Sequence, residues 1–311
     1  MKGLELSKRY WEAHGASLFD GLPSEVRDSV AVGLVGQGSE CLGFDDEASQ
    51  DHDFGPGFCV WLPREAYECW GEELARRYAA LPQEFLGYRR QGTELAGQRV
   101  GVMELETFWS SLTGLEGVPR SSREWLAIPE QLVACATNGE VFSDPFGRFS
   151  ELRRCYLGFY PLDVLKKKVS ADCASAAQAG QYNLPRMLGR GDFVAANAAR
   201  AEFVMSLMAC LHLLSRTYMP FYKWSFRSLR DHAGVPARLC DVISDIASVP
   251  IAEIDQGAIE SLCRVIKRMV VHLGWASTSS DFLLDVAMDI SCGIADEYLR
   301  GLPIGAGRFR A

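Results

Sequence analysis

An apolar run that ends in glycines places the tightest limit on the fold of this chain. Val30–Val35 is rich in β-branched residues, and Gly36 and Gly38 follow it directly. A short apolar run bounded by glycines predicts a buried strand. Because glycines let backbone N–H groups approach phosphate oxygens closely, Gly38 and the hydroxyl of Ser39 form a candidate phosphate-binding loop.

Two aspartates follow this loop after eleven residues, as Asp51-His52-Asp53, in a second strand-like run that Gly55-Pro56-Gly57 interrupts. Residues i and i+2 of a strand share one face, about 6–7 Å apart, so the two carboxylates are expected to converge while His52 faces the sheet interior. Such a pair can bind two Mg²⁺ ions about 3.5–4 Å apart, and Mn²⁺ can substitute. The plainer interpretation, loop acids beside an ordinary turn, remains open.

The first 120 residues alternate strand and helix patterns. Val100, Val102 and Glu104 share the parity of a third strand. Helices are predicted over residues 4–18, from Ser24, from Pro63 to Leu74, and from Glu106 to Leu115. We therefore predict an α+β or α/β domain with a small mixed sheet over residues 1–120.

Beyond about residue 120, apolar residues recur with the helical period i, i+3 and i+4. The pattern is clearest in Phe193–Ser215, Ile251–Leu273 and Asp281–Leu299. Asn138-Gly139 indicates a β-turn near the junction. The prediction for residues 121–311 is an all-α helical domain that packs closely on the first.

Charge and cysteine pattern limit the partners and the compartment. The formal net charge is −8 and the pI about 5.3, which disfavours nucleic acid because phosphate neutralisation needs a concentrated basic face. The ten cysteines form no Cys-x-x-Cys pair and no zinc spacing with the five histidines. The N-terminus has no signal-peptide pattern, so reduced thiols in the cytoplasm are expected. The longest apolar stretch, Phe203–Leu214, is shorter than the roughly 18 residues of a membrane span.

The two motifs resemble those of the DNA polymerase beta-like nucleotidyltransferase superfamily, with VGLVGQGSE at residues 32–40 and DHDFGP at residues 51–56. Within that superfamily the chain resembles a bacterial family catalogued only as a domain of unknown function. The resemblance covers most of the chain and extends through residues 138–142, Asp144, residues 160–163, Arg186, residues 190–192 and residues 222–224. It implies magnesium, a nucleoside triphosphate such as ATP, and a helical partner domain that closes the cleft.

The resemblance also implies a third carboxylate on a neighbouring strand. Glu104 is the main candidate to join Asp51 and Asp53 as a metal ligand, because it continues the parity of Val102. Glu106 shares that parity, but glutamate is also favoured in a first helical turn by the helix macrodipole. Without a third carboxylate, the site would be that of a weakened enzyme.

Five residues in the second half are candidates for nucleotide contacts or catalysis. Lys223 can meet the triphosphate while Tyr222 stacks on the base or the acceptor; the alternative is an aromatic packing seam in which the lysine reaches water. Arg186 and Arg190 flank a loop and can reach phosphates across the cleft. Asp192 is first of all a predicted helix N-cap, and secondly a candidate general base.

Two further charged segments are expected to be solvated. Lys166-Lys167-Lys168 has the pattern of an exposed helix face. Asp45-Asp46-Glu47 has the composition of a solvated loop, although it lies close to the aspartate pair in the sequence.

Together these features predict a magnesium-dependent enzyme that transfers a nucleoside monophosphate from a nucleoside triphosphate to a hydroxyl group and releases pyrophosphate. A small molecule is the favoured acceptor, a protein side chain is the next choice, and the acidic pI disfavours an RNA end. Two alternatives remain. One is a nucleotide-binding regulatory or antitoxin-like module with little or no turnover, and the other is a helical interaction protein whose α/β half is only a scaffold.

Overall fold

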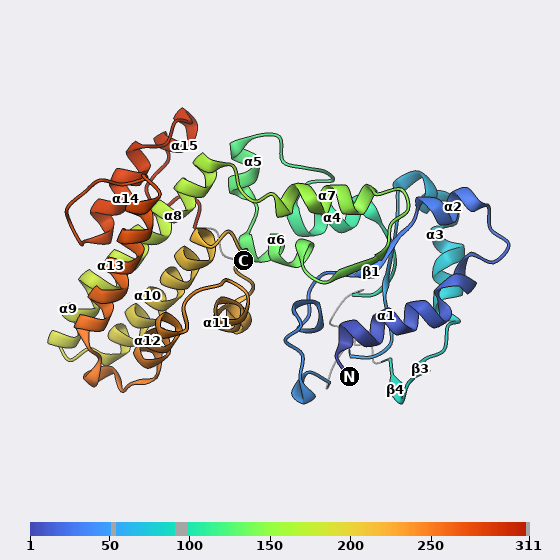
Figure 1. Ribbon diagram of the computed structural model, residues 1–311, viewed down its shortest axis with the longest axis horizontal. Helices are drawn as coiled ribbons and strands as arrows, with labels where there is room; N and C mark the ends of the chain where they lie inside the picture. Colours follow the sequence, from blue (N-terminus) through green and yellow to red (C-terminus); the bar gives the residue numbers. More distant parts are fainter. Residues whose placement is uncertain (51–53, 91–98, 309–311) are drawn as a thin grey trace. The chain divides into compact units, whose positions relative to one another are not determined.

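A computed structural model describes residues 1–50, 54–90 and 99–308. The chain divides into two units (Figure 1). The first comprises Met1–Val118 and Leu132–Gly158, and the second comprises Pro119–Gln131 and Phe159–Ala311. The segment 132–158 therefore belongs to the unit that contains the glycine-rich loop, although it lies beyond the sequence boundary at residue 120.

The first unit is built on a four-stranded mixed sheet in the order β5-β2-β1-β6. Its strands are β1 (Ala31–Leu34), β2 (Cys59–Leu62), β5 (Gly101–Glu104) and β6 (Glu140–Ser143). β1 runs antiparallel to β2 and β6, whereas β2 and β5 are parallel. β3 (Glu84–Phe85) and β4 (Tyr88–Arg89) form a separate antiparallel pair. The predicted small mixed sheet is confirmed.

The strand directions place the glycine-rich segment at one end of the sheet. Gly33 of β1 pairs with Cys59, the first residue of β2, and Cys59 pairs with Gly101, the first residue of β5. The carboxyl end of β1 therefore lies beside the amino ends of β2 and β5. Glu104 pairs with Leu62 at the far end of β5, roughly 10 Å along the strand from Gly101.

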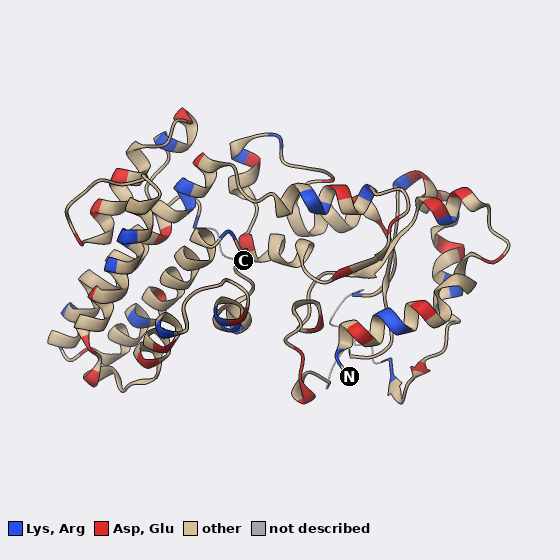
Figure 2. Ribbon diagram, in the orientation of Figure 1, with Lys and Arg blue, Asp and Glu red and all other residues tan. Residues whose placement is uncertain are grey.

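Helices cover both faces of this sheet. They are α1 (Gly3–His14), α2 (Ser24–Ser29), α3 (Arg64–Ala79), α4 (Leu105–Thr113), α7 (Arg148–Leu157) and α6 (Glu130–Thr137), which spans the division between the units. Short 3₁₀ turns are η1 (Gly15–Phe19), η2 (Glu40–Leu42) and η3 (Glu47–Gln50). Acidic and basic residues are interspersed along α1 and α3 (Figure 2), unlike the concentrated basic face that polyanion binding needs.

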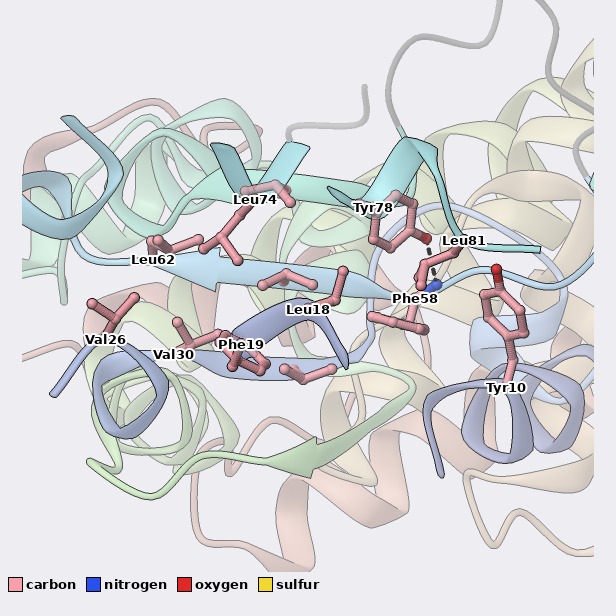
Figure 3. Packing of buried hydrophobic residues seen from close by; sticks show 13 residues of the cluster. Tyr10, Leu18, Phe19, Val26, Val30, Phe58, Leu62, Leu74, Tyr78 and Leu81 are labelled. Atoms are coloured by element: carbon pink, nitrogen blue, oxygen red, sulfur yellow. Dashed lines mark hydrogen bonds between the residues drawn. The ribbon is translucent and has the colours of Figure 1, made fainter. Parts of the chain in front are cut away.

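One face of the sheet packs against side chains from α1, η1 and α3 (Figure 3). Val32, Val60 and Val102 come from three different strands, and burying each contributes about 1.5–3 kcal/mol of transfer free energy. The hydroxyl of Tyr78 on α3 accepts a hydrogen bond from the N–H of Phe58 at 2.9 Å. This bond holds the chain where β2 begins.

Successive strand residues point to opposite sides, so Trp61, which stands between Val60 and Leu62, lies on the opposite face of the sheet. This face is lined by aromatic rings. Trp61 of β2 stacks on Phe149 of α7 with ring centroids 4.1 Å apart. Trp109 of α4 stacks on Tyr156 of α7 at 5.2 Å. These contacts fix α7, which also carries Arg153, on the sheet.

Every regular element described in the second unit is a helix, which confirms the helical C-terminal region. The helices are α5 (Ser122–Ala127), α8 (Leu162–Ala176), η5 (Ala177–Asn183), α9 (Leu184–Gly189), α10 (Phe193–Leu214), α11 (Tyr222–Asp231), α12 (Ala237–Ser248), η6 (Ile251–Glu253), α13 (Gln256–His272), α14 (Leu283–Cys292) and α15 (Glu297–Gly301). η5 is a π-helix in which a Cβ on Gly180 would overlap the ring of Phe203.

Helix α10 confirms the helical pattern predicted over Phe193–Ser215 and extends well beyond the uncharged stretch Phe203–Leu214. With 22 residues it is long and apolar enough, by length and composition, to cross a membrane. Within the unit it packs against α8, α9 and α12, and Phe203, Leu207 and Leu211 are buried there. This is the environment of a core helix.

The prediction of a solvated lysine face is wrong for two of the three lysines. Lys167 and Lys168 are buried, and burial lowers the pKa of both. The Lys167 ammonium donates to the carbonyls of Leu302 and Pro303 at 2.9 and 3.0 Å, and Lys168 donates to the carbonyl of Gly307 at 3.3 Å. The C-terminal segment covers this side of α8, so backbone carbonyls take the place of water.

The prediction of a solvated acidic loop is wrong for Asp45. Its side chain is buried, and Oδ2 accepts the N–H of Gly3 at 2.8 Å. Gly3 is the first residue of α1, where unpaired N–H groups favour a carboxylate. Asp45 therefore ties the loop after the glycines to the start of the first helix.

Candidate functional site

The loop that follows β1 requires glycine at two positions. Gly36 has φ +134° and Gly38 has φ +144°, a region of backbone conformation that residues other than glycine rarely adopt. A Cβ on Gly38 would also overlap the Arg99 guanidinium. Ser39 then precedes the short turn η2. The predicted loop thus lies at the carboxyl end of β1, with its backbone brought close to charged groups.

Asn138 holds this loop from the neighbouring strand connection. Its side-chain Oδ1 accepts the N–H of Gly36 at 3.0 Å, and its Nδ2 donates to the Gly36 carbonyl at 2.7 Å. The next residue, Gly139, donates its N–H to the carbonyl of Cys41 at 2.8 Å. The sequence indicated only a turn here, whereas the structure makes Asn138 a two-bond support of the glycine-rich loop.

Arg153 supports Asn138 in turn. Its Nη2 donates to the carbonyls of Thr137, Asn138 and Gly139 at 2.9, 3.2 and 3.1 Å. The guanidinium is partly buried, and burial lowers its pKa. A cation placed on the carbonyls at the end of α6 is favoured by the helix dipole. Sequence reasoning missed Arg153, because it lies 14 residues beyond the turn that it binds.

Arg99 brings a positive charge to the loop. Its Nε donates to the carbonyl of Gln37 at 2.9 Å, and its Nη2 donates to Gln37 and to the Glu40 carboxylate. The side chains of Arg99 and Glu40 are 25% and 16% exposed. Burial raises the pKa of Glu40, and Arg99 opposes that rise. Sequence reasoning missed both residues, although Arg99 stands two residues before β5, the strand that starts at the same end of the sheet as the loop.

A pocket of about 440 Å³ opens beside the loop. Gly36, Gln37 and Arg99 line it together with Tyr67 of α3 and Thr107 of α4. Its volume lies in the range of small-ligand sites, about 300–1,000 Å³. The Arg99 guanidinium, the Thr107 hydroxyl and the Tyr67 ring thus share one pocket, and a cation of this kind can bind an anionic ligand.

The predicted third carboxylates are engaged elsewhere. Glu104 lines the same pocket, but its Oε1 accepts a hydrogen bond from Arg64 Nε at 2.8 Å. Glu106 accepts the backbone N–H of Arg64 at 3.0 Å, at the start of α3. In residues 1–50, 54–90 and 99–308, no three His, Cys, Asp or Glu side chains gather to hold a metal. Asp51 and Asp53, with His52, lie outside the described residues.

The five candidates of the second unit lie at the two ends of α10. Arg186 and Arg190 precede its first residue, and Tyr222 and Lys223 begin α11 beyond its last. A helix of 22 residues is roughly 33 Å long. The two groups are therefore not brought together within this unit.

The local contacts of these candidates are mostly structural. Asp192 is the N-cap of α10, as predicted, and accepts the N–H of Ala195 at 3.0 Å. Arg186 donates to the Tyr182 hydroxyl and lies over its ring at 4.6 Å. Lys223 stands 5.8 Å from the ring of Trp224. Tyr222 is 78% exposed.

One segment of the chain is similar to a known protein family. Residues 125–225 match a family model described as a domain of unknown function (DUF4037). No curated protein and no solved structure matches. The matched segment includes Asn138, Arg153 and the five candidates of the second unit but not the glycine-rich loop. Less than half of the chain is thus similar to a family, and that family has no described activity.

Proposed function

We propose that this protein is a magnesium-dependent nucleotidyltransferase that transfers a nucleoside monophosphate from a nucleoside triphosphate to the hydroxyl group of a small molecule. The observation that carries the proposal is the loop Gly36–Ser39, held at the end of the sheet with two glycines at positive φ and opening onto a pocket lined by Arg99. Backbone N–H groups in such a loop can bind phosphate oxygens, and the guanidinium can offset their charge.

The metal ligands of the proposal are Asp51 and Asp53. Carboxylate oxygens are the ligands that Mg²⁺ prefers. Magnesium held by these carboxylates would activate the acceptor hydroxyl and offset the charge of the departing pyrophosphate. The residues of the loop and Arg99 bind and orient the triphosphate, so that the rate gain comes from positioning and charge.

The site and the cysteines guide the choice of acceptor and compartment. A pocket of about 440 Å³ suits a small molecule better than a macromolecule. A protein side chain is the second candidate acceptor.

All ten cysteines are free, which fits the reducing cytoplasm that we propose as the compartment.

One observation favours a second function, a nucleotide-binding regulatory module with little or no turnover. Glu104 and Glu106 are both bound to Arg64. If neither turns toward Asp51 and Asp53, the site has two carboxylates rather than three. Triphosphate binding would then persist while pyrophosphate release would be slow or absent.

Calorimetric titration tests the proposal. ATP, GTP, CTP and UTP are added with magnesium to the wild type and to the double variant Asp51→Asn/Asp53→Asn. Asp241→Asn/Asp245→Asn, which removes two exposed acids of α12, is the matched control. The proposal requires magnesium-dependent binding of a triphosphate by the wild type and the control that the first variant loses. Binding of no triphosphate by the wild type would rule out the enzyme. Release of labelled pyrophosphate then separates the transferase from the regulatory module.

A further inference from the structure

The ion pair between Arg99 and Glu40 stands directly on the glycine-rich loop. A Cβ built on Gly38 would overlap the guanidinium and would lie 2.5 and 2.6 Å from the two carboxylate oxygens. Both charged groups therefore occupy the space that a side chain at residue 38 would need, directly against the glycine-rich loop. The guanidinium is tied to the loop as well, through the carbonyl of Gln37.

The carboxylate of Glu40 has poor surroundings for a charged group. Its side chain is 16% exposed, and burial raises its pKa while Asp45 adds a second negative charge nearby. Arg99 opposes this effect. A carboxylate is a planar anion that binds a guanidinium in the same manner as a phosphate edge. A phosphate carries more charge and more acceptor oxygens, so it can replace the carboxylate on Arg99.

We propose that Arg99 is the phosphate-binding cation of this pocket, and that Glu40 holds its place until a polyphosphate ligand displaces it. The ligand class is a chain of phosphates, as in a nucleoside triphosphate or in inorganic polyphosphate. The exchange makes Glu40 an internal competitor: it keeps Arg99 oriented in the free protein and weakens binding of small anions. The identification of the polyphosphate with a nucleotide rests on the proposed function, whereas the anion exchange does not.

Calorimetry with inorganic tripolyphosphate in metal-free buffer tests this exchange without the aspartate pair. Arg99→Gln should weaken binding at least about tenfold, the usual effect of losing a charge-assisted hydrogen bond. Glu40→Gln should tighten binding about tenfold, because the competitor is removed. Glu73→Gln is the matched control, since Glu73 forms a comparable pair with Arg77 on α3, each side chain 27% exposed. The control should bind as the wild type does.

The double variant Glu40→Gln/Arg99→Gln separates exchange from a general charge effect. The proposal requires that Glu40→Gln give no gain once Arg99 is absent. An equal gain in tripolyphosphate affinity with and without Arg99 would overturn the proposal. So would wild-type affinity in Arg99→Gln, and so would the absence of tripolyphosphate binding in both the wild type and Glu40→Gln. Should Arg99→Gln fail to fold, Arg99→Lys keeps the charge, loses the fork of donors, and should still weaken binding severalfold; wild-type affinity in that variant would contradict the proposal.

These outcomes are independent of those for the proposed function. Tripolyphosphate exchange on Arg99 without any nucleotide transfer would leave the anion site standing and remove the enzyme. Magnesium-dependent transfer that is unaffected by Arg99→Gln would leave the transferase standing and remove Arg99 as its phosphate-binding residue.

Discussion

Replacing Asn138 by alanine should loosen the glycine-rich loop without unfolding the unit. The variant removes both hydrogen bonds between the Asn138 side chain and Gly36, at 3.0 and 2.7 Å. Each contributes about 0.5–1.5 kcal/mol net, so the local cost is about 1–3 kcal/mol. Since Gly36 is buried, water cannot fully replace the lost partners.

Amide hydrogen exchange is the assay, because it reports local opening rather than global unfolding. At a factor of ten per 1.4 kcal/mol, exchange at Gly36 should accelerate about 5- to 150-fold in Asn138→Ala. Asn197→Ala, which removes a hydrogen bond from an exposed turn of α10, should leave Gly36 unchanged. Unchanged exchange at Gly36 in a folded Asn138→Ala variant would refute the claim that Asn138 supports the loop.

Three further predictions concern stability. Gly180→Ala should destabilise the second unit by about 1–3 kcal/mol because the new methyl group overlaps the buried ring of Phe203. Thermal melting should show this loss of stability. The control Gly189→Ala, at a position with open space around it, should melt as the wild type does. Burial lowers the pKa of His212 to about 4, so the unfolded state binds more protons and the free energy of unfolding should fall as pH drops from about 6.5 to 4. In urea titrations at several pH values, the free energy of unfolding of His212→Gln should change less with pH than that of the wild type. An equal change with pH in both proteins would contradict this prediction. Burial also lowers the pKa of Lys168, so stability should rise as pH increases toward about 10.4; melts of Lys168→Met should lack that rise.

Features set by local pattern were predictable from the sequence. The apolar run Val30–Val35 is short, rich in β-branched residues and followed by glycines, which favours a buried strand, and β1 occupies Ala31–Leu34. The N-cap at Asp192 was equally local, since a short polar side chain before an apolar helix satisfies the free N–H groups there. The glycines of the loop belong with these, because the missing side chain permits the positive φ angles that Gly36 and Gly38 adopt.

Features set by distant contacts were not predictable. Asn138 meets Gly36 across 102 residues, and Arg99 meets Glu40 across 59. The periodicity of apolar residues along the sequence does not indicate such pairs. Lys168 lies in a run of three lysines that is typical of a solvated helix face, yet its ammonium donates to a carbonyl 139 residues away in the sequence. β6 escaped prediction for the same reason, because its partner β1 lies over a hundred residues earlier.

Whether the triphosphate binds at the glycine-rich loop can be seen in a crystal structure with magnesium and a non-hydrolysable triphosphate analogue of the base selected by calorimetry. We expect phosphate oxygens within hydrogen-bonding distance of the backbone N–H groups of Gly38 and Ser39, magnesium on Asp51 and Asp53, and Arg99 turned from Glu40 to phosphate. A triphosphate bound away from this loop, or an empty loop at saturating analogue, would contradict it.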